Sequence, residues 1–254
     1  MGFYTREGDL DESARVVSQL RKSDPENPEV LYAAYRTYGD LAGESMLTLA
    51  LSAPDSSQMQ QVIAHEETRQ GNTNGAIAHD RKAIALNPHL PGVHFELAEL
   101  LHSASDPKSK QEAEAEYHKA LAENSQDERA ELRLGEIEAQ KGEVQQAFTD
   151  YSRAVVLQPT DADAKLGLAK TLIEMNQSDK ALLLLEDAAK LEPTDAVVHY
   201  RLGVLYRKMG HVDQANSEIE LYKKYKEAKE KLRTLYQEMM VQPQQISAED
   251  ADEK

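Results

Sequence analysis

The sequence predicts an all-α protein built from a repeated helical hairpin, and three observations lead to this class. Strong helix formers (Ala, Leu, Glu, Lys and Gln) dominate the 254 residues, whereas Gly (12) and Pro (9) are few. Prolines recur at a fixed interval, since Pro54 and Pro88, and likewise Pro159 and Pro193, are 34 residues apart. The stretches between them share small residues at matching positions, as repeated units do.

Each repeated unit reads as a helix, a short turn, a second helix and a closing residue. Four second-helix segments contain two alanines seven positions apart, followed five positions later by Pro or Ser; they are 76–88, 113–125, 147–159 and 181–193. A small residue also occurs in each first helix, for example in the pair Leu134-Gly135. Turn-forming residues separate the two helices, at Gly71, Gly142, Asn176 and Gly210.

This pattern resembles the tetratricopeptide-repeat family, in the form of a bacterial-type array. The family's units of about 34 residues carry a Leu-Gly pair, two alanines and a closing proline. The resemblance implies a right-handed α-solenoid of stacked helix-turn-helix hairpins. Small residues are expected where two helices touch, because a larger side chain would push their axes apart.

The repeats predict a single solenoid over residues 1–241. Its expected parts are a partial repeat at 1–27, a degenerate repeat at 28–56, repeats at 57–90, 91–127, 128–161 and 162–195, and a last repeat with a capping helix at 196–241. The partial repeat keeps at most Gly2–Arg6 of its first helix. We therefore expect that the chain is a fragment of a longer array or that another element covers this end.

Helix starts are signalled by residues that cap helices well. The residues before five of the expected first helices are Asn27, Ser56, Asp127, Asp161 and Asp195. Pro28 and Pro91 are expected at the first helical position, where proline is tolerated.

The C-terminal region predicts one long amphipathic helix from Val212. Apolar residues such as Ile219, Tyr225 and Leu232 recur at three- and four-residue steps, and no proline occurs before Pro243. This helix should cover the open apolar end of the stack. The polar and acidic residues 242–254 are expected to be a disordered tail.

Composition excludes several classes of function. The net charge of −16 argues against nucleic-acid binding, and the absence of cysteine excludes disulfides and thiolate chemistry. No apolar stretch reaches the ~18 residues of a membrane span, and the first residues do not form a signal peptide. We expect no cofactor and no metal site, and the compartment, cytoplasmic or periplasmic, stays open. With no nucleophile–base pair or phosphate-binding loop, no enzyme activity is expected.

The family resemblance implies a protein–protein interaction scaffold, in which the first helices line a concave groove for a peptide or helix of a partner. The groove residues that the resemblance assigns to this chain are Tyr32, Arg36, His65, Arg69, Phe95, Glu99, Arg129, Leu132, Arg133, Leu166, Lys170, Tyr200, Arg201 and Arg207. The Arg129/Arg133 pair and the cations near Arg201 suit a partner with acidic and apolar anchors.

Alternatives remain open at this stage. Phe95 and Leu132 could instead pack between hairpins, with the arginines solvated. The C-terminal helix (212–241) could pair with a second copy to make a homodimer, through Tyr222, Tyr225, Leu235, Tyr236 and Met239. Two acidic residues at usually apolar positions, Glu67 and Asp80, are expected to reach water.

Overall fold

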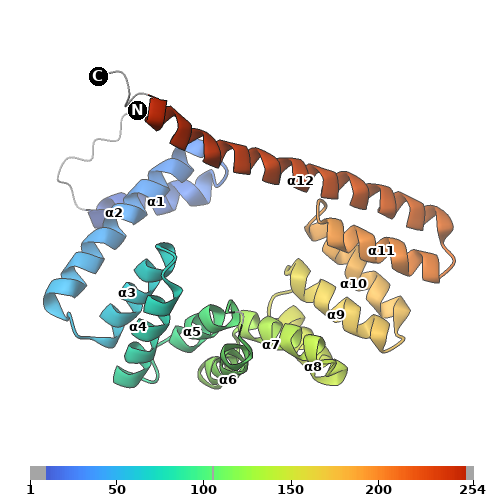
Figure 1. The fold of residues 1–254 in the computed structure, drawn as a ribbon, viewed down its shortest axis with the longest axis horizontal. Coiled ribbons are helices and arrows are strands. Elements are labelled where there is room, and N and C mark those ends of the chain that lie inside the picture. Colours follow the sequence, from blue (N-terminus) through green and yellow to red (C-terminus); the bar gives the residue numbers. More distant parts are fainter. Residues whose placement is uncertain (1–9, 105, 250–254) are drawn as a thin grey trace. The chain divides into compact units, whose positions relative to one another are not determined.

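The computed structural model describes residues 10–104 and 106–249, which form twelve α-helices and no strand (Figure 1). The predicted all-α class is confirmed. The helices are α1 (Leu10–Ser23), α2 (Pro28–Ser52), α3 (Ser57–Arg69), α4 (Thr73–Leu86), α5 (Val93–His102), α6 (Pro107–Glu123), α7 (Glu128–Lys141), α8 (Val144–Leu157), α9 (Ala162–Glu174), α10 (Ser178–Leu191), α11 (Ala196–Lys208) and α12 (Val212–Glu249). They divide into two compact units, Met1–Glu116 and Tyr117–Lys254. The predicted boundaries of the repeats from 57 onward fall between successive helix pairs.

Four hairpins turn in the same way. Gly71, Gly142 and Gly210 have φ values of 78°, 79° and 84°, and Asn176 has 59°. The backbone N–H of the residue after each of these donates to a carbonyl oxygen five residues earlier. After Asn176, for example, the N–H of Gln177 donates to the carbonyl oxygen of Leu172 at 2.8 Å. This is the Schellman arrangement, which satisfies the last carbonyls of a helix and favours Gly or Asn in the left-handed position. The turns predicted from sequence are therefore confirmed.

The predicted N-caps are also confirmed. The side chains of Asn27, Ser56, Asp127, Asp161 and Asp195 each accept a hydrogen bond from a backbone N–H in the first turn of the following helix. Pro28 is in the first turn of α2, as expected. The placement of Pro91 was wrong, because α5 begins two residues later at Val93. Gly92 precedes it with φ 81°, a conformation that cannot continue into a helix.

Small residues lie at the helix contacts. The paired alanines of the second helices are almost fully buried, with Ala76, Ala147 and Ala181 at 0% exposure. A side chain added at Gly135 or Gly167 would meet the ring of Tyr151, the large residue that fills the space these two glycines leave. The close approach between helices thus depends on the absence of a side chain, as the repeat pattern predicts.

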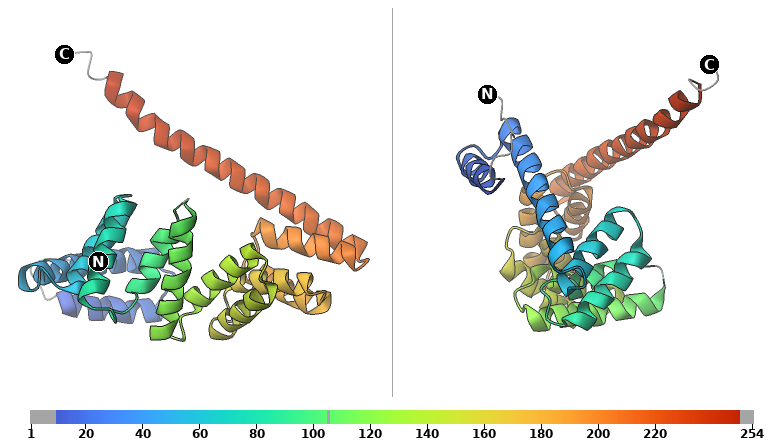
Figure 2. Two further views of the ribbon diagram at one scale, coloured as in Figure 1. Left: turned by 60° about the horizontal axis from the view of Figure 1, so that its bottom comes forward. Right: turned by 90° about the vertical axis from the view of Figure 1, so that its left-hand side faces the viewer.

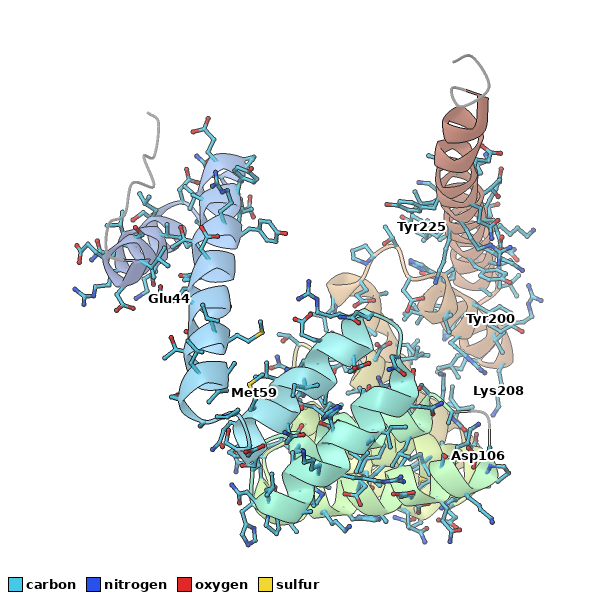
Figure 3. The ribbon with its side chains drawn as sticks, turned by 60° about the vertical axis from the view of Figure 1, so that its left-hand side comes forward. Glu44, Met59, Asp106, Tyr200, Lys208 and Tyr225 are labelled. Atoms are coloured by element: carbon cyan, nitrogen blue, oxygen red, sulfur yellow. The ribbon has the colours of Figure 1, made fainter. Side chains whose placement is uncertain are left out.

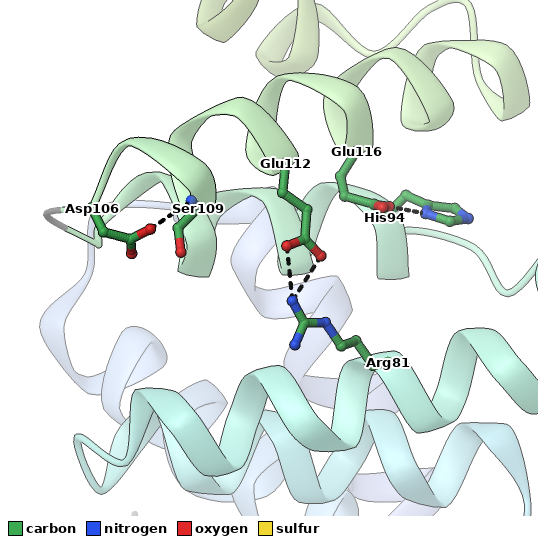
Figure 4. A network of polar contacts seen from close by, with 6 residues as sticks. All are labelled: Arg81, His94, Asp106, Ser109, Glu112 and Glu116. Carbon is green, nitrogen blue, oxygen red and sulfur yellow. Dashed lines mark hydrogen bonds and ion pairs between the residues drawn. The ribbon is translucent and has the colours of Figure 1, made fainter.

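A polar residue at the fourth position of each regular repeat pairs with the second helix of that repeat. The shortest contacts are Gln60–His79 (2.9 Å), His94–Glu116 (2.5 Å), Glu131–Arg153 (2.9 Å), Lys165–Asp187 (3.5 Å) and His199–Glu218 (2.7 Å). Figure 4 shows the His94 pair beside a second inter-helix ion pair, Arg81–Glu112. A polar contact between its two helices therefore stabilises each of these hairpins in addition to its apolar contacts.

The degenerate repeat at 28–56 does not form a hairpin. Its residues build α2, one uninterrupted helix of 25 residues (Figures 1 and 3). Two glycines, Gly39 and Gly43, lie within this helix, and a Cβ at either position would meet nothing within 4 Å. A repeat that is five residues short leaves too few residues for a full second helix, which accounts for the straight form.

The last helix is longer than predicted. It runs from Val212 to Glu249, so the backbone of residues 242–249 is helical although we expected a disordered tail there. A single proline removes only one helical hydrogen bond, and the Gln, Ala and Glu that surround Pro243 favour helix. Residues 250–254 and the expected helix remnant at Gly2–Arg6 lie outside the described residues.

Asp80 corrects another expectation. It was expected to reach water, but its residue is only 1% exposed on α4. Burial, and next the negative charge of Glu96, raise its pKa from 3.8 to about 7, while His65 opposes this shift. Glu67, in contrast, is only partly buried.

Candidate partner-binding surface

The family resemblance predicts an apolar ladder at the fifth position of each repeat, formed by Tyr32, Phe95, Leu132, Leu166 and Tyr200 and interrupted by Gln61. Phe95 (8% exposed) and Leu166 (6%) are buried, and Leu132 is partly buried against the core of the second unit. Tyr32 (63%) and Tyr200 (42%) are exposed. The ladder is therefore mixed: its middle residues mainly pack the hairpins, and its outer tyrosines are accessible to a partner.

The arginines expected to bind a partner carboxylate are already engaged. Arg133 forms an ion pair with Glu136 at 2.9 Å, and Arg129 lies 3.6 Å from Asp127, the cap of its own helix. In the first unit, Arg69 pairs with Glu66 in the same way. These contacts weaken the case for Arg129 and Arg133 as a carboxylate clamp.

His65 joins a local cluster in the first unit. Its Nε2 lies 2.9 Å from a carboxylate oxygen of Glu96, which also accepts a hydrogen bond from Gln61 at 2.8 Å. The cluster connects α3 with α5 and lies close to the buried Asp80. Arg36 is exposed on α2 and Glu99 is partly buried on α5.

The second unit contains a cleft of about 1120 Å³ that joins three elements. One wall is α9, another is the connection between α10 and α11, and the third is α12. Its lining residues include the predicted groove residues Leu166 and Lys170, together with Val197, Tyr222, Tyr225 and Leu232. The cleft exists because α12 packs on α11 along its first half and then continues beyond it (Figure 2).

Aromatic rings form the wall of this cleft where α12 leaves α11. The ring of Tyr222 lies 5.2 Å from that of Tyr200, and Tyr225 stacks on His199 at 5.4 Å. Figure 3 shows Tyr200 on α11 and Tyr225 on α12. Tyr222 and Tyr225 are both half-buried, so they offer apolar ring surface and a polar hydroxyl to a ligand.

Lys170 is the most perturbed cation of the cleft. Burial, and next the positive charge of Arg201, lower its pKa, and the acidic groups Glu136, Asp163 and Asp195 only partly oppose this. The neighbouring Asp163 shows the complementary effect, because burial and then nearby acidic groups raise its pKa. A half-buried ammonium of this kind would gain from a further negative charge.

The other charged residues of the cleft differ in the partners that they contact. Asp195 already caps α11, and Glu230 pairs with Arg233 at 2.8 Å. The lysines have neutral partners: Lys226 donates to the hydroxyl of Tyr222 at 3.2 Å, and Lys224 lies over the ring of Tyr225 at 5.3 Å. The lining holds four lysines, at 170, 224, 226 and 229, and four acidic residues, Asp163, Glu192, Asp195 and Glu230, so the cleft is formally neutral in a chain of net charge −16.

Family comparisons agree with the hairpin geometry. Two family models described as tetratricopeptide repeats match residues 110–162 and 138–187. Residues 110–187 of this chain are therefore tetratricopeptide repeats. The matched repeats are those of α6 to α10, in which the spacing of alanines, turns and prolines is most regular. A search of curated proteins finds no match.

Solved structures of tetratricopeptide-repeat proteins share this fold. The crystal structure of MamA superposes with a TM-score of 0.59 at 22% identity, covering 66% of this chain and 97% of that one. YrrB, described as having an unusual peptide-binding site, gives 0.59 at 17% identity, covering 71% and 91%. PilF of Pseudomonas aeruginosa gives 0.57 at 20% identity, covering 66% and 76%. At these identities the likeness concerns the fold alone.

The described residues contain neither a clustered metal site nor a membrane-spanning helix. Across residues 10–104 and 106–249, no group of three or more His, Asp or Glu side chains is arranged to hold a metal ion. In the same part of the chain, no helix, α12 included, combines the length and apolar character that a bilayer span requires.

The sequence predicts only a small part of the lining of this cleft. Leu166 and Lys170 follow from the family resemblance, but the contribution of Lys224, Lys226 and Lys229 was missed, because this basic run reads most simply as a solvated helix face. The cleft depends on how α12 is oriented over α9, which periodicity does not encode. The remaining groove residue of this unit, Arg207, is exposed near the end of α11.

Proposed function

We propose that the protein is an interaction scaffold that binds an extended peptide or a helix of a partner protein in the groove of its first helices, with the cleft under α12 as the main contact. The observation that carries this proposal is the meeting of apolar and cationic side chains from three elements in one cleft. Pockets with apolar walls and a few placed charges are the usual form of a binding site.

The proposed partner segment has apolar and acidic anchors. An apolar side chain would contact Leu166 and the rings of Tyr222 and Tyr225. An Asp or Glu nearby would pair with Lys170 and offset its unfavourable burial. The fold likeness to YrrB, whose printed description names a peptide-binding site, supports a peptide as the ligand class.

Selection from a displayed peptide library with the full chain as bait tests this proposal. We expect the selected peptides to combine acidic with apolar residues and to lose about tenfold or more in affinity for Lys170→Glu, measured by fluorescence anisotropy. Lys180→Glu, which changes an exposed lysine of α10, is the matched control and should bind as the wild type does. Equal affinity of the Lys170→Glu variant would contradict the proposal.

Self-association through α12 is the second candidate function. Leu232 (52%), Leu235 (52%) and Tyr236 (58%) are exposed on this helix. Tyr222 and Tyr225 contact α11 instead, so the seam is shorter than the sequence predicts, and the side chain of Met239 lies outside the described residues. Sedimentation equilibrium of Leu235→Glu tests it: a dimer that becomes a monomer supports this interface, and an unchanged mass contradicts it.

A further inference from the structure

Helix α2 exposes an apolar face along most of its length. On this face Leu31 is 43% exposed, Tyr35 77%, Tyr38 37% and Met46 41%. Ala34, which is 4% exposed, lies beside this face, and Leu49 lines a pocket together with Leu10 and Asp11 of α1. An exposed stripe with this many large apolar side chains is unusual on a protein surface and indicates an interaction site.

Comparison with a regular repeat shows what this face is missing. In the repeat at 128–161, the residues at the fourth, eighth and eleventh positions all contact the second helix, α8. Glu131 pairs with Arg153, Gly135 lies against Tyr151, and Glu138 shares a hydrogen bond with Asp150. The equivalent residues of the degenerate repeat are Leu31, Tyr35 and Tyr38. Because α2 does not fold back, the place of a second helix beside them is unfilled.

The sequence of α2 still carries the trace of a hairpin. Regular repeats turn at Gly-Glu-Val (142–144) or Asn-Gln-Ser (176–178), and α2 contains the similar run Gly-Glu-Ser at 43–45. The residues after it, among them Met46 and Leu49, are thus the counterpart of a second helix. Both halves of one hairpin, the first helix and the shortened second one, are present within a single straight helix.

The apolar stripe is symmetric about its centre. Its central residues follow steps of 3, 4, 4 and 3 and read the same in both directions from Ala42; they are Tyr35, Tyr38, Ala42, Met46 and the half-buried Leu49. These steps keep all five on one helix face. If a second α2 lies antiparallel across Ala42, Tyr38 meets Met46, Tyr35 meets Leu49, and small residues meet at the crossing point.

The charged residues of α2 lie away from the apolar stripe. The charged residues of α2 are Glu29, Arg36, Asp40 and Glu44. At 100° per residue all four lie on the other side of the helix from the stripe. Two copies of a chain with net charge −16 can therefore meet here without bringing like charges together.

We propose that α2 pairs antiparallel with α2 of a second copy of this chain, around a two-fold axis at Ala42. Each copy then supplies the second helix that the other copy's degenerate repeat lacks. The contact is isologous, so it closes at a dimer and does not extend into a fibre. This inference is independent of the proposed peptide site.

Sedimentation equilibrium over a range of concentrations tests the dimer. We expect a dimer for the wild type and a monomer for Tyr35→Glu, which places two charges in the seam. Val156→Glu is a matched control, because Val156 is 77% exposed on α8, as Tyr35 is on α2; it should remain dimeric. Circular dichroism should show equal helix content for all three proteins, since both substituted side chains are exposed.

Cross-linking identifies the arrangement. The chain has no cysteine, so Ala42→Cys with a short bis-maleimide should give covalent dimers, and Val156→Cys should give none. Three results would overturn the proposal: a monomeric wild type, a dimer that survives Tyr35→Glu and is lost in Leu235→Glu, or an intrachain cross-link in monomeric Tyr35→Cys/Leu49→Cys, whose positions are about 21 Å apart along a straight helix. The last result would mean that α2 folds back at Gly43.

Discussion

His199 and Glu218 join the two helices of the last hairpin through a bond of 2.7 Å, and His94 and Glu116 form the same contact in an earlier repeat. In both cases the other ring nitrogen faces the carbonyl oxygen of the proline that closes the preceding repeat, Pro193 at 2.9 Å and Pro88 at 3.1 Å. One side chain therefore connects a hairpin internally and to the repeat before it.

Replacement of this histidine should loosen the last hairpin. We expect His199→Phe to lower the free energy of unfolding by about 1–3 kcal/mol, because the Glu218 carboxylate and the Pro193 carbonyl lose a buried donor. Urea unfolding followed by circular dichroism measures the effect. His199→Phe/Glu218→Leu should recover part of the loss, because the buried carboxylate is then absent; equal loss in the single and double variants would show that the bond is unimportant.

Asp80 should make stability fall as pH rises. Its pKa is about 7 in the folded chain and near 3.8 when unfolded. Between these values the unfolded chain releases the proton and the folded chain keeps it, so the folded state loses stability over this interval. We expect Asp80→Asn to remove roughly 2–4 kcal/mol of pH dependence between pH 4 and 8, measured by urea unfolding at several pH values.

A change at Glu96 separates the causes of the Asp80 effect. The charge of Glu96 raises the pKa of Asp80, second to burial. Glu96→Gln should therefore move the pH-dependent interval to lower pH without removing it, because the burial of Asp80 remains. A pH profile identical to that of the wild type in both variants would show that Asp80 is not the responsible group.

Gly167 should tolerate no side chain. A Cβ at this position would overlap Cε1 and Cζ of Tyr151, whose ring is 5% exposed and cannot move freely. We expect Gly167→Ala to cost about 1–3 kcal/mol of unfolding free energy, as overpacked cores do. In the Tyr151→Leu background, which lacks the ring, Gly167→Ala should cost less unfolding free energy than it costs in the wild type.

The left-handed turn residues offer a paired test of backbone strain. Gly142 has φ 79° and a Cβ there would meet nothing within 4 Å, so Gly142→Ala changes conformational preference without a clash. We expect a cost of about 1–2 kcal/mol in thermal or urea unfolding. Asn176→Gly should be neutral or slightly stabilising at φ 59°. If both substitutions destabilise equally, a cause other than φ dominates.

Many features of this fold follow from local sequence signals. The turns at Gly71, Gly142, Asn176 and Gly210 were predicted because they require left-handed φ, and Asn27 and Asp161 were predicted as caps because short polar side chains reach free backbone N–H groups. These are interactions over a few residues, so a single repeat carries enough information to specify them. Pro91 was misplaced because the left-handed Gly92 after it was not considered.

The candidate sites depended on interactions between distant residues. The cleft needs α12 to pack on α11, which brings Tyr222 next to Tyr200, and to continue so that its lysines line the same space as Lys170 of α9. The burial of Asp80 likewise depends on side-chain packing that no periodicity reveals. Spacing places a residue on a helix face, but it does not say which element covers that face.

The sequence by itself determined the class, the 34-residue period, the hairpin turns and the helix caps, because each of these rests on backbone preferences of adjacent residues. Tertiary structure alone decided that the shortened repeat becomes one straight helix, that Asp80 is buried, and that α12 helps form a cleft. Those outcomes depend on which surfaces meet. The energy of such a contact depends on residues of two elements that are far apart in the sequence.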